Sequence, residues 1–151
     1  METSKGALGA VVIDSDPDMR ECLTALLTGM GYRVHTAGTA AEGVRLAREH
    51  HPVLVTTELH LPPPPGALGT DGTDGAEGTD GLDGIRQIQS FSNAYILVVA
   101  ASSDPFDLYT ALESVADDYI VKPFNPLILR ARVAALARRP RNKRPAVPSI
   151  R

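Results

Sequence analysis

The chain has 151 residues, of which 43% are hydrophobic and 22% are charged, as in ordinary soluble globular domains. A domain of this length buries a core without disulfides or metals, and a single cysteine excludes a disulfide framework and a thiolate metal site. No apolar run approaches the ~20 residues that span a bilayer, so we expect a cytoplasmic protein that makes no membrane contact. The cysteine, Cys22, lies among apolar residues at helical spacing, which predicts a small core side chain.

The charge is unevenly distributed along the chain. Residues 1–137 carry a net −9, whereas residues 138–151, "RRPRNKRPAVPSIR", carry +6. A basic, proline-containing end of this kind is typical of a solvated linker or tail, and nonspecific contact with nucleic-acid phosphates is the alternative. We therefore expect a folded domain over 1–139 and a basic linker or tail over 140–151.

Strand and helix patterns alternate along the folded part. Apolar or alternating runs predict strands at 8–14, 32–37, 52–58, 94–102 and 117–121. Helical patterns follow at 16–30, 39–51, 84–91, 104–115 and 125–139. Capping residues support several of these starts, since Asp16 precedes Pro17 and Thr39 precedes Glu42 by three residues. Five alternating βα units with short connections predict an α/β fold around a doubly wound parallel sheet.

One connection is long. Residues 62–81 begin with four prolines and continue as a Gly-Thr-Asp repeat without periodic apolar residues, which predicts a disordered surface insert. Asp71, Asp74 and Asp80 supply oxygen ligands of the kind found in calcium loops, but the spacing lacks a closing bidentate glutamate. We favour the surface loop.

Polar side chains follow several of the predicted strands. Asp14, Ser15 and Asp16 follow the first strand, Glu58 the third and Lys122 the fifth. In a parallel sheet these positions share the carboxyl edge, where ligands bind at the switch point of the strand order. Acids from two strands facing a lysine from a third are a layout suited to phosphate and magnesium.

The ordered motifs resemble those of a known family. "VVIDSDPDMRECLTALLTGMGYRV", "GLDGIRQI" and "ADDYIVKPFNPLILRARVAALARR" resemble the receiver domain of bacterial two-component response regulators, most closely the OmpR/PhoB subfamily, over about residues 8–139. The resemblance implies the flavodoxin-like (βα)5 fold with strand order 2-1-3-4-5. It also implies a cis Lys122–Pro123 peptide bond.

The resemblance places the family's phosphorylation machinery on altered residues. The phosphoacceptor aspartate corresponds to Glu58, the second acid of the magnesium-binding pair to Ser15, and the hydroxyl-bearing switch residue to Ala100. A glutamate carries its carboxylate ~1.5 Å farther, and misplacement by ~1 Å costs about 100-fold in rate. Asp14, Lys122 and the switch aromatic Tyr119 match the family.

These departures predict a degenerate pocket made of Asp14, Ser15, Asp16, Glu58, Ala100 and Lys122. We expect no enzymatic activity, no cofactor, and weak or absent Mg²⁺ binding, with Asp14, Asp16 and Glu58 as the residual candidate ligands. Asp16 suits helix capping better than metal binding. Our hypothesis is a direct Glu58–Lys122 ion pair that fixes one conformation without a kinase.

The resemblance also implies an output surface. Receivers of this subfamily dimerise through helix 4, strand 5 and helix 5 of their fold, which correspond here to residues 104–115, 117–121 and 125–139. Asp118, Arg132 and Arg139 match charged positions of that face. We therefore expect a homodimer and the regulatory part of a transcription regulator, whose DNA contact comes from a C-terminal domain beyond residue 151. The alternatives are a free-standing module that binds a protein or small-molecule regulator and, less favoured, a working phosphoacceptor.

Overall fold

The structure is a computed structural model that describes residues 8–61, 80–101, 105, 109, 113 and 116–140. Its strands are β1 (Leu8–Ile13), β2 (Tyr32–Ala37), β3 (Leu54–Thr57), β4 (Tyr95–Ala100) and β5 (Asp118–Val121). Its helices are α2 (Pro17–Gly29), α3 (Ala40–His50), α4 (Asp80–Gln89) and α6 (Pro126–Ala137). The strands pair in parallel in the order β2-β1-β3-β4-β5, which confirms the predicted doubly wound sheet.

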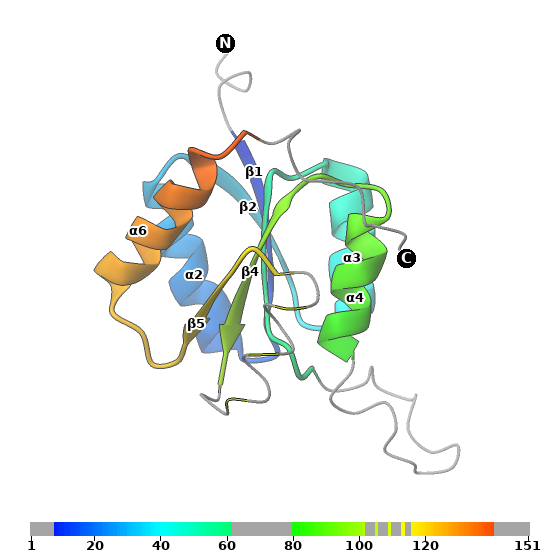
Figure 1. Cartoon of the computed structure of the whole chain (residues 1–151), viewed down its shortest axis with the longest axis horizontal. Coiled ribbons are helices and arrows are strands. Elements are labelled where there is room, and N and C mark those ends of the chain that lie inside the picture. The colour runs from blue at the N-terminus through cyan, green and yellow to red at the C-terminus, as the bar shows by residue number, and fades with distance from the viewer. Residues whose placement is uncertain are drawn as a thin grey trace.

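Two helical layers cover the sheet. Helices α2 and α6 lie together on one face, and α3 and α4 lie together on the other (Figure 1). The central strands are therefore buried on both sides, and every residue of β3 and β4 is buried. Alternate residues of β1 feed the two cores, since Ala10 and Val12 face α2 and α6 while Val11 and Ile13 face α3 and α4.

The helix starts follow the expected capping chemistry. The Asp16 carboxylate accepts the Asp18 N–H at 3.0 Å, and Thr39 Oγ1 accepts the Glu42 N–H at 3.2 Å. The Glu42 carboxylate reaches the N–H of Gly38, one residue before the cap, rather than that of Thr39. These bonds fix where α2 and α3 leave the carboxyl edge of the sheet.

Two sequence-based expectations are wrong. Cys22 is exposed on α2 and is not a core residue, because Leu23 and Leu27 supply the buried stripe of that helix. Helix α4 begins at Asp80, four residues before the predicted start and inside the range assigned to the insert. Its early start is possible because Gly81 packs directly against the backbone that follows β3.

Several predicted features lie outside the described residues. They include positions 62–79 of the insert, with Asp71 and Asp74, and positions 141–151 of the tail. Of the helix predicted at 104–115, the structure describes Pro105, Tyr109 and Glu113, each helical and exposed. The predicted division at residue 139 is not tested. In the part of the chain that is described, no helix is both long and apolar enough to cross a bilayer.

Candidate functional site

Three strand ends bring the predicted pocket together at the carboxyl edge of the sheet. The register places Ile13 beside Thr57, so Asp14 and Glu58 leave the sheet at the same level, and Lys122 follows β5 two residues farther along at the same edge. Asp14 is 1% exposed and Glu58 is 8% exposed, which makes them the buried acids at this edge. The Lys122–Pro123 peptide bond is cis, as the resemblance implied.

Lys122 lies between the two acids. Its Nζ donates a hydrogen bond to Glu58 Oε2 at 3.0 Å, which confirms the expected direct ion pair. The same nitrogen lies 2.9 Å from Asp14 Oδ2, but this contact is an ion pair without hydrogen-bond geometry. Two carboxylates therefore share one ammonium group in a largely dehydrated site, where the interaction is stronger than in water.

Ser15 provides the other hydrogen bonds to the Glu58 carboxylate. Its N–H and its Oγ both donate to Glu58 Oε1, at 3.0 and 2.9 Å. With Lys122 on the other oxygen, the carboxylate accepts three hydrogen bonds from two residues. The extra methylene of the glutamate thus carries its carboxylate across the pocket to the end of β1, where it links β1, β3 and β5.

Burial and charge shift the protonation equilibria of this cluster. Burial is the largest influence on Asp14 and raises the pKa of its carboxyl, and the charge of Glu58 raises it further against the opposing effect of Lys122. For Lys122, burial acts to lower the pKa of the ammonium group, but its close contacts with the Asp14 and Glu58 carboxylates outweigh burial and raise that pKa. Lys122 is therefore charged at neutral pH.

The oxygens that magnesium would require are already occupied. Asp14 Oδ1 accepts the Asp16 N–H at 2.9 Å, and Asp14 Oδ2 faces Lys122. Both oxygens of Glu58 are bonded, and the Asp16 carboxylate caps α2. Within the described ranges, no group of three or more His, Cys, Asp or Glu side chains has a metal-holding arrangement. The residues present therefore do not fit the charged octahedral oxygen set that Mg²⁺ prefers.

Of the two predicted switch positions, Ala100 lies beside this cluster. The Lys122 N–H donates to the Ala100 carbonyl at 2.8 Å, so Ala100 directly adjoins the lysine on the neighbouring strand. Ala100 is buried and offers only a methyl group to the pocket. The Tyr119 ring is 7% exposed and packs in the core on the α3 and α4 side.

The candidate interface residues form ion pairs within the chain. Arg132 Nη1 lies 3.1 Å from Asp118 Oδ1, and Arg139 Nη1 lies 3.5 Å from Asp117 Oδ1. The two arginines are about half exposed. Arg132 lies on α6 and Arg139 just after it, and both pair with acids at or just before the start of β5.

Two contacts of the site, besides the bonds from Ser15 to Glu58, were not predicted from the sequence. Arg20 Nη1 donates to the Asp14 carbonyl at 2.7 Å. Arg20 lies one helical turn after the Asp16 cap, and this spacing is the sequence signal from which the contact could have been predicted. A Cβ on Gly81 would lie 2.2 Å from the Glu58 carbonyl oxygen. Nothing in the local sequence indicates that second contact, because it joins residues on either side of the long connection.

With this geometry in view, comparison with known proteins identifies the family. A family model described as "Response regulator receiver domain" matches residues 10–134. The chain belongs to the response regulator receiver family. It is 36% identical over 129 residues to the "DNA-binding response regulator MtrA" of Mycolicibacterium smegmatis, which covers 85% of this chain and 50% of that protein. It is 34% identical over 129 residues to the "Transcriptional regulatory protein AfsQ1" of Streptomyces coelicolor, which covers 85% and 51%.

Solved structures show the same fold. A two-component response regulator from Clostridium difficile superposes with a TM-score of 0.72 at 25% identity, over 87% of this receiver domain and 97% of that chain. A CheY-like receiver from Methanospirillum hungatei JF-1 superposes with a TM-score of 0.70 at 20% identity, over 87% and 94%. The chain spans about half the length of the curated relatives it matches.

Proposed function

We propose that this receiver domain works without phosphorylation, in a conformation that the Glu58 carboxylate holds. The observation that carries the proposal is the set of three hydrogen bonds from Ser15 and Lys122 to that carboxylate. A carboxylate engaged in this way is a poor nucleophile, because attack on a phosphorus centre needs a free, aligned oxygen and a shared metal ion. The domain is then not an enzyme and needs no cofactor.

The same three bonds resemble those of a phosphoryl group. A phosphoryl oxygen accepts charge-assisted hydrogen bonds from lysine and backbone N–H groups, and Glu58 accepts both kinds here. The carboxylate lacks the additional phosphoryl oxygens, and Ala100 has no hydroxyl to bond one. The pocket therefore holds one charge state permanently instead of switching between two.

Intact-mass spectrometry tests the proposal directly. The purified domain is incubated with Mg²⁺ and acetyl phosphate, and we expect no adduct of ~80 Da, the mass that phosphorylation adds. The matched control is the triple variant Ser15→Asp, Glu58→Asp, Ala100→Thr, which restores the family's residues and should gain the adduct. A stoichiometric adduct on the unaltered chain that disappears in Glu58→Gln would contradict the proposal.

We also propose that the domain is the regulatory part of an OmpR/PhoB-like transcription regulator in the cytoplasm. The relatives named as DNA-binding or transcriptional regulators are longer than this chain, which aligns with about half of each. DNA contact would come from a domain outside residues 1–151. Sequencing the full gene and measuring promoter binding of the full-length product, with residues 1–151 as the non-binding control, test this assignment.

Homodimerisation would use the surface of β5 and α6. Asp118 and Arg132 already form an ion pair within one chain. In a dimer each residue must therefore pair with the other protomer instead of, or in addition to, its own chain. Such exchanged ion pairs contribute to specificity more than to affinity. Sedimentation over a dilution series should show a dimer that Arg132→Glu weakens. Arg45→Glu, an exposed arginine on α3, is the control. Equal association constants for the two variants would remove this surface from the proposal.

A further inference from the structure

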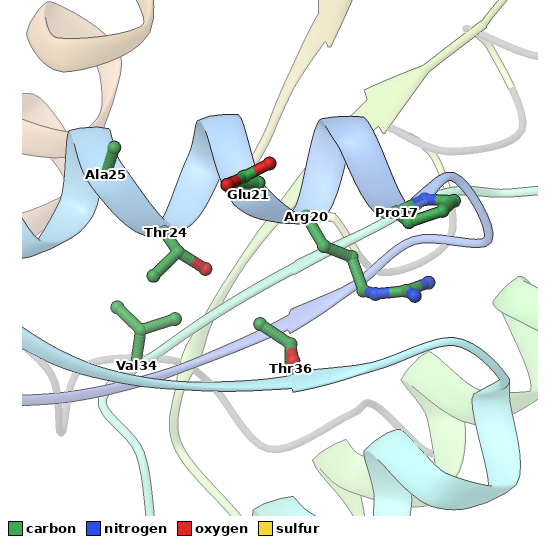
Figure 2. A pocket seen from close by; sticks show the side chains of 7 residues that line it. All are labelled: Pro17, Arg20, Glu21, Thr24, Ala25, Val34 and Thr36. Carbon is green, nitrogen blue, oxygen red and sulfur yellow. The ribbon is translucent and has the colours of Figure 1, made fainter.

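A groove lies between α2 and β2, on the side of the domain away from the proposed output surface. It has a volume of about 590 Å³, within the range of about 300–1,000 Å³ typical of ligand pockets. Its lining residues are Pro17, Arg20, Glu21, Thr24, Ala25, Val34 and Thr36. Figure 2 shows Val34 and Thr36 rising from β2 toward the helix, with Arg20 and Thr24 pointing from α2 toward the strand.

The strand that borders the groove is an edge of the sheet. β2 pairs with β1 on one side, and within the described ranges no strand pairs with its other side. A hydrogen bond just after β1 shows which backbone groups of β2 face outward. The Asp14 N–H donates to the Ala37 carbonyl, so Ala37 faces β1, and parallel pairing then directs positions 33 and 35 to β1 as well.

Val34 and Thr36 therefore direct their N–H and C=O groups toward the open edge, while their side chains line the groove. These two residues therefore provide what an extended peptide needs for binding. Their backbone N–H and C=O groups can form hydrogen bonds with it, and their side chains line the groove beside it. An extended peptide has N–H and C=O groups at the matching repeat, which a compact organic molecule lacks.

The charged residues of the groove indicate which side chain the bound segment should carry. The Arg20 guanidinium lies toward the Thr36 end of the groove, and of its five N–H donors one is used on the Asp14 carbonyl. The remaining donors suit a carboxylate, which a guanidinium binds through paired hydrogen bonds. Glu21 lies on the helix side of the same groove and disfavours a second acid there.

We propose that the groove between α2 and β2 binds an extended segment of a partner protein, which adds as a strand to β2 and places an acidic side chain at Arg20. A second copy of this chain fits less well. Helix α2 lies over the edge strand, so a copy paired through β2 would bring its own helix onto the same face. The groove adjoins the pocket through Arg20, which donates to the Asp14 carbonyl, but the proposal does not rest on the proposed function.

The test uses a set of acetylated, amidated peptides of about six residues that alternate Val or Thr with Ser and end in Asp. Binding is followed by the backbone amide resonances and hydrogen exchange of Val34 and Thr36. We expect saturable shifts and slower exchange at these two amides. Peptides with N-methylated backbones, which cannot donate to the Val34 and Thr36 carbonyls, should bind at least about tenfold more weakly.

Three variants separate the parts of the proposal. Ala25→Tyr fills the groove and should weaken binding about tenfold, whereas Ala135→Tyr, at an exposed alanine on α6, should leave it unchanged. Arg20→Gln should remove the preference for Asp over Asn at the peptide end without abolishing binding. Circular dichroism and thermal unfolding establish that each variant is folded.

Three outcomes would overturn the proposal. The first is the absence of saturable shifts at Val34 and Thr36 with every peptide up to millimolar concentration. The second is equal affinity for the N-methylated peptides, which would exclude strand addition. The third is amide protection at the two residues that rises with protein concentration in the absence of peptide, which would assign this edge to a second copy of the chain.

Discussion

Glu58 Oε2 and Lys122 Nζ lie 3.0 Å apart, and the same ammonium group lies 2.9 Å from Asp14 Oδ2. One lysine is thus the shared counter-charge of two buried acids that come from different strands. Removal of the lysine leaves two facing carboxylates without a counter-charge, and an uncompensated buried charge is among the most destabilising changes in a protein. The stability of the carboxyl edge should depend on this residue more than on any surface pair.

Lys122→Met is expected to lower the free energy of unfolding by about 3 kcal/mol at pH 7. Without the ammonium group, the already raised pKa of the Asp14 carboxyl rises further, so the folded variant binds that proton more tightly than the unfolded chain and recovers stability as the pH falls. Urea unfolding at pH 5 and pH 8 measures the change. Arg45→Met, which removes exposed pairs on α3, should cost no more than about 0.5 kcal/mol at either pH.

Asp14 should make the free energy of unfolding depend on pH in a second way, and the direction of its pKa shift gives the sign. Burial raises its pKa in the folded state above the ordinary value of 3.8. The contribution of this group is therefore fully present below that value and declines as the pH rises through the raised pKa. The difference in unfolding free energy between the unaltered chain and Asp14→Asn should fall as the pH is raised from 4. A difference that grows over this interval would contradict the assignment.

Gly81→Ala should disturb the backbone that carries Glu58. The added Cβ would lie 2.2 Å from the Glu58 carbonyl oxygen and 2.4 Å from that of Leu59, so α4 or the end of β3 must shift. We expect a loss of about 1–3 kcal/mol in unfolding free energy, as for other overpacked sites. Gly29→Ala is the matched control. Nothing lies within 4 Å of its added Cβ, and alanine is favoured in helices by up to about 1 kcal/mol.

The imidazole rings of His35 and His50 stack with centroids 3.6 Å apart and an angle of 12° between planes. Burial, followed by the charges of His50 and Arg33, lowers the pKa of His35 against the opposing charge of Glu49. Folding therefore favours neutral His35, so its contribution is complete above about pH 6.5 and is lost as the pH falls below that value.

His35→Phe keeps a ring against His50 and removes the titration. The variant should lose stability less steeply than the unaltered chain when the pH is lowered from 7 to 5, as followed by thermal unfolding. His60→Gln, at an exposed position after β3, should keep the original slope. Equal slopes for His35→Phe and the unaltered chain would show that the stacked pair does not control this dependence.

Much of this receiver domain follows from sequence alone because its signals are local. Apolar runs bounded by Asp16–Pro17 or Asn125–Pro126 determine where strands end and helices begin, and the alternation of elements determines a parallel sheet. The same order places Asp14, Glu58 and Lys122 at one edge, so their meeting is predictable. The altered residues Ser15, Glu58 and Ala100 are also visible without coordinates.

Only the tertiary structure decided which hydrogen bonds and ion pairs these side chains form. Ser15 binds Glu58 through both its N–H and its hydroxyl, although the two residues are 43 positions apart in the sequence. The register between β1 and β3 brings them together, and no local sequence pattern encodes that register. The exposure of Cys22, the contact of Gly81 with the Glu58 carbonyl and the groove beside Val34 likewise arise from the packing of elements distant in sequence. Periodicity determines which residues share a face, whereas packing geometry decides which of them meet.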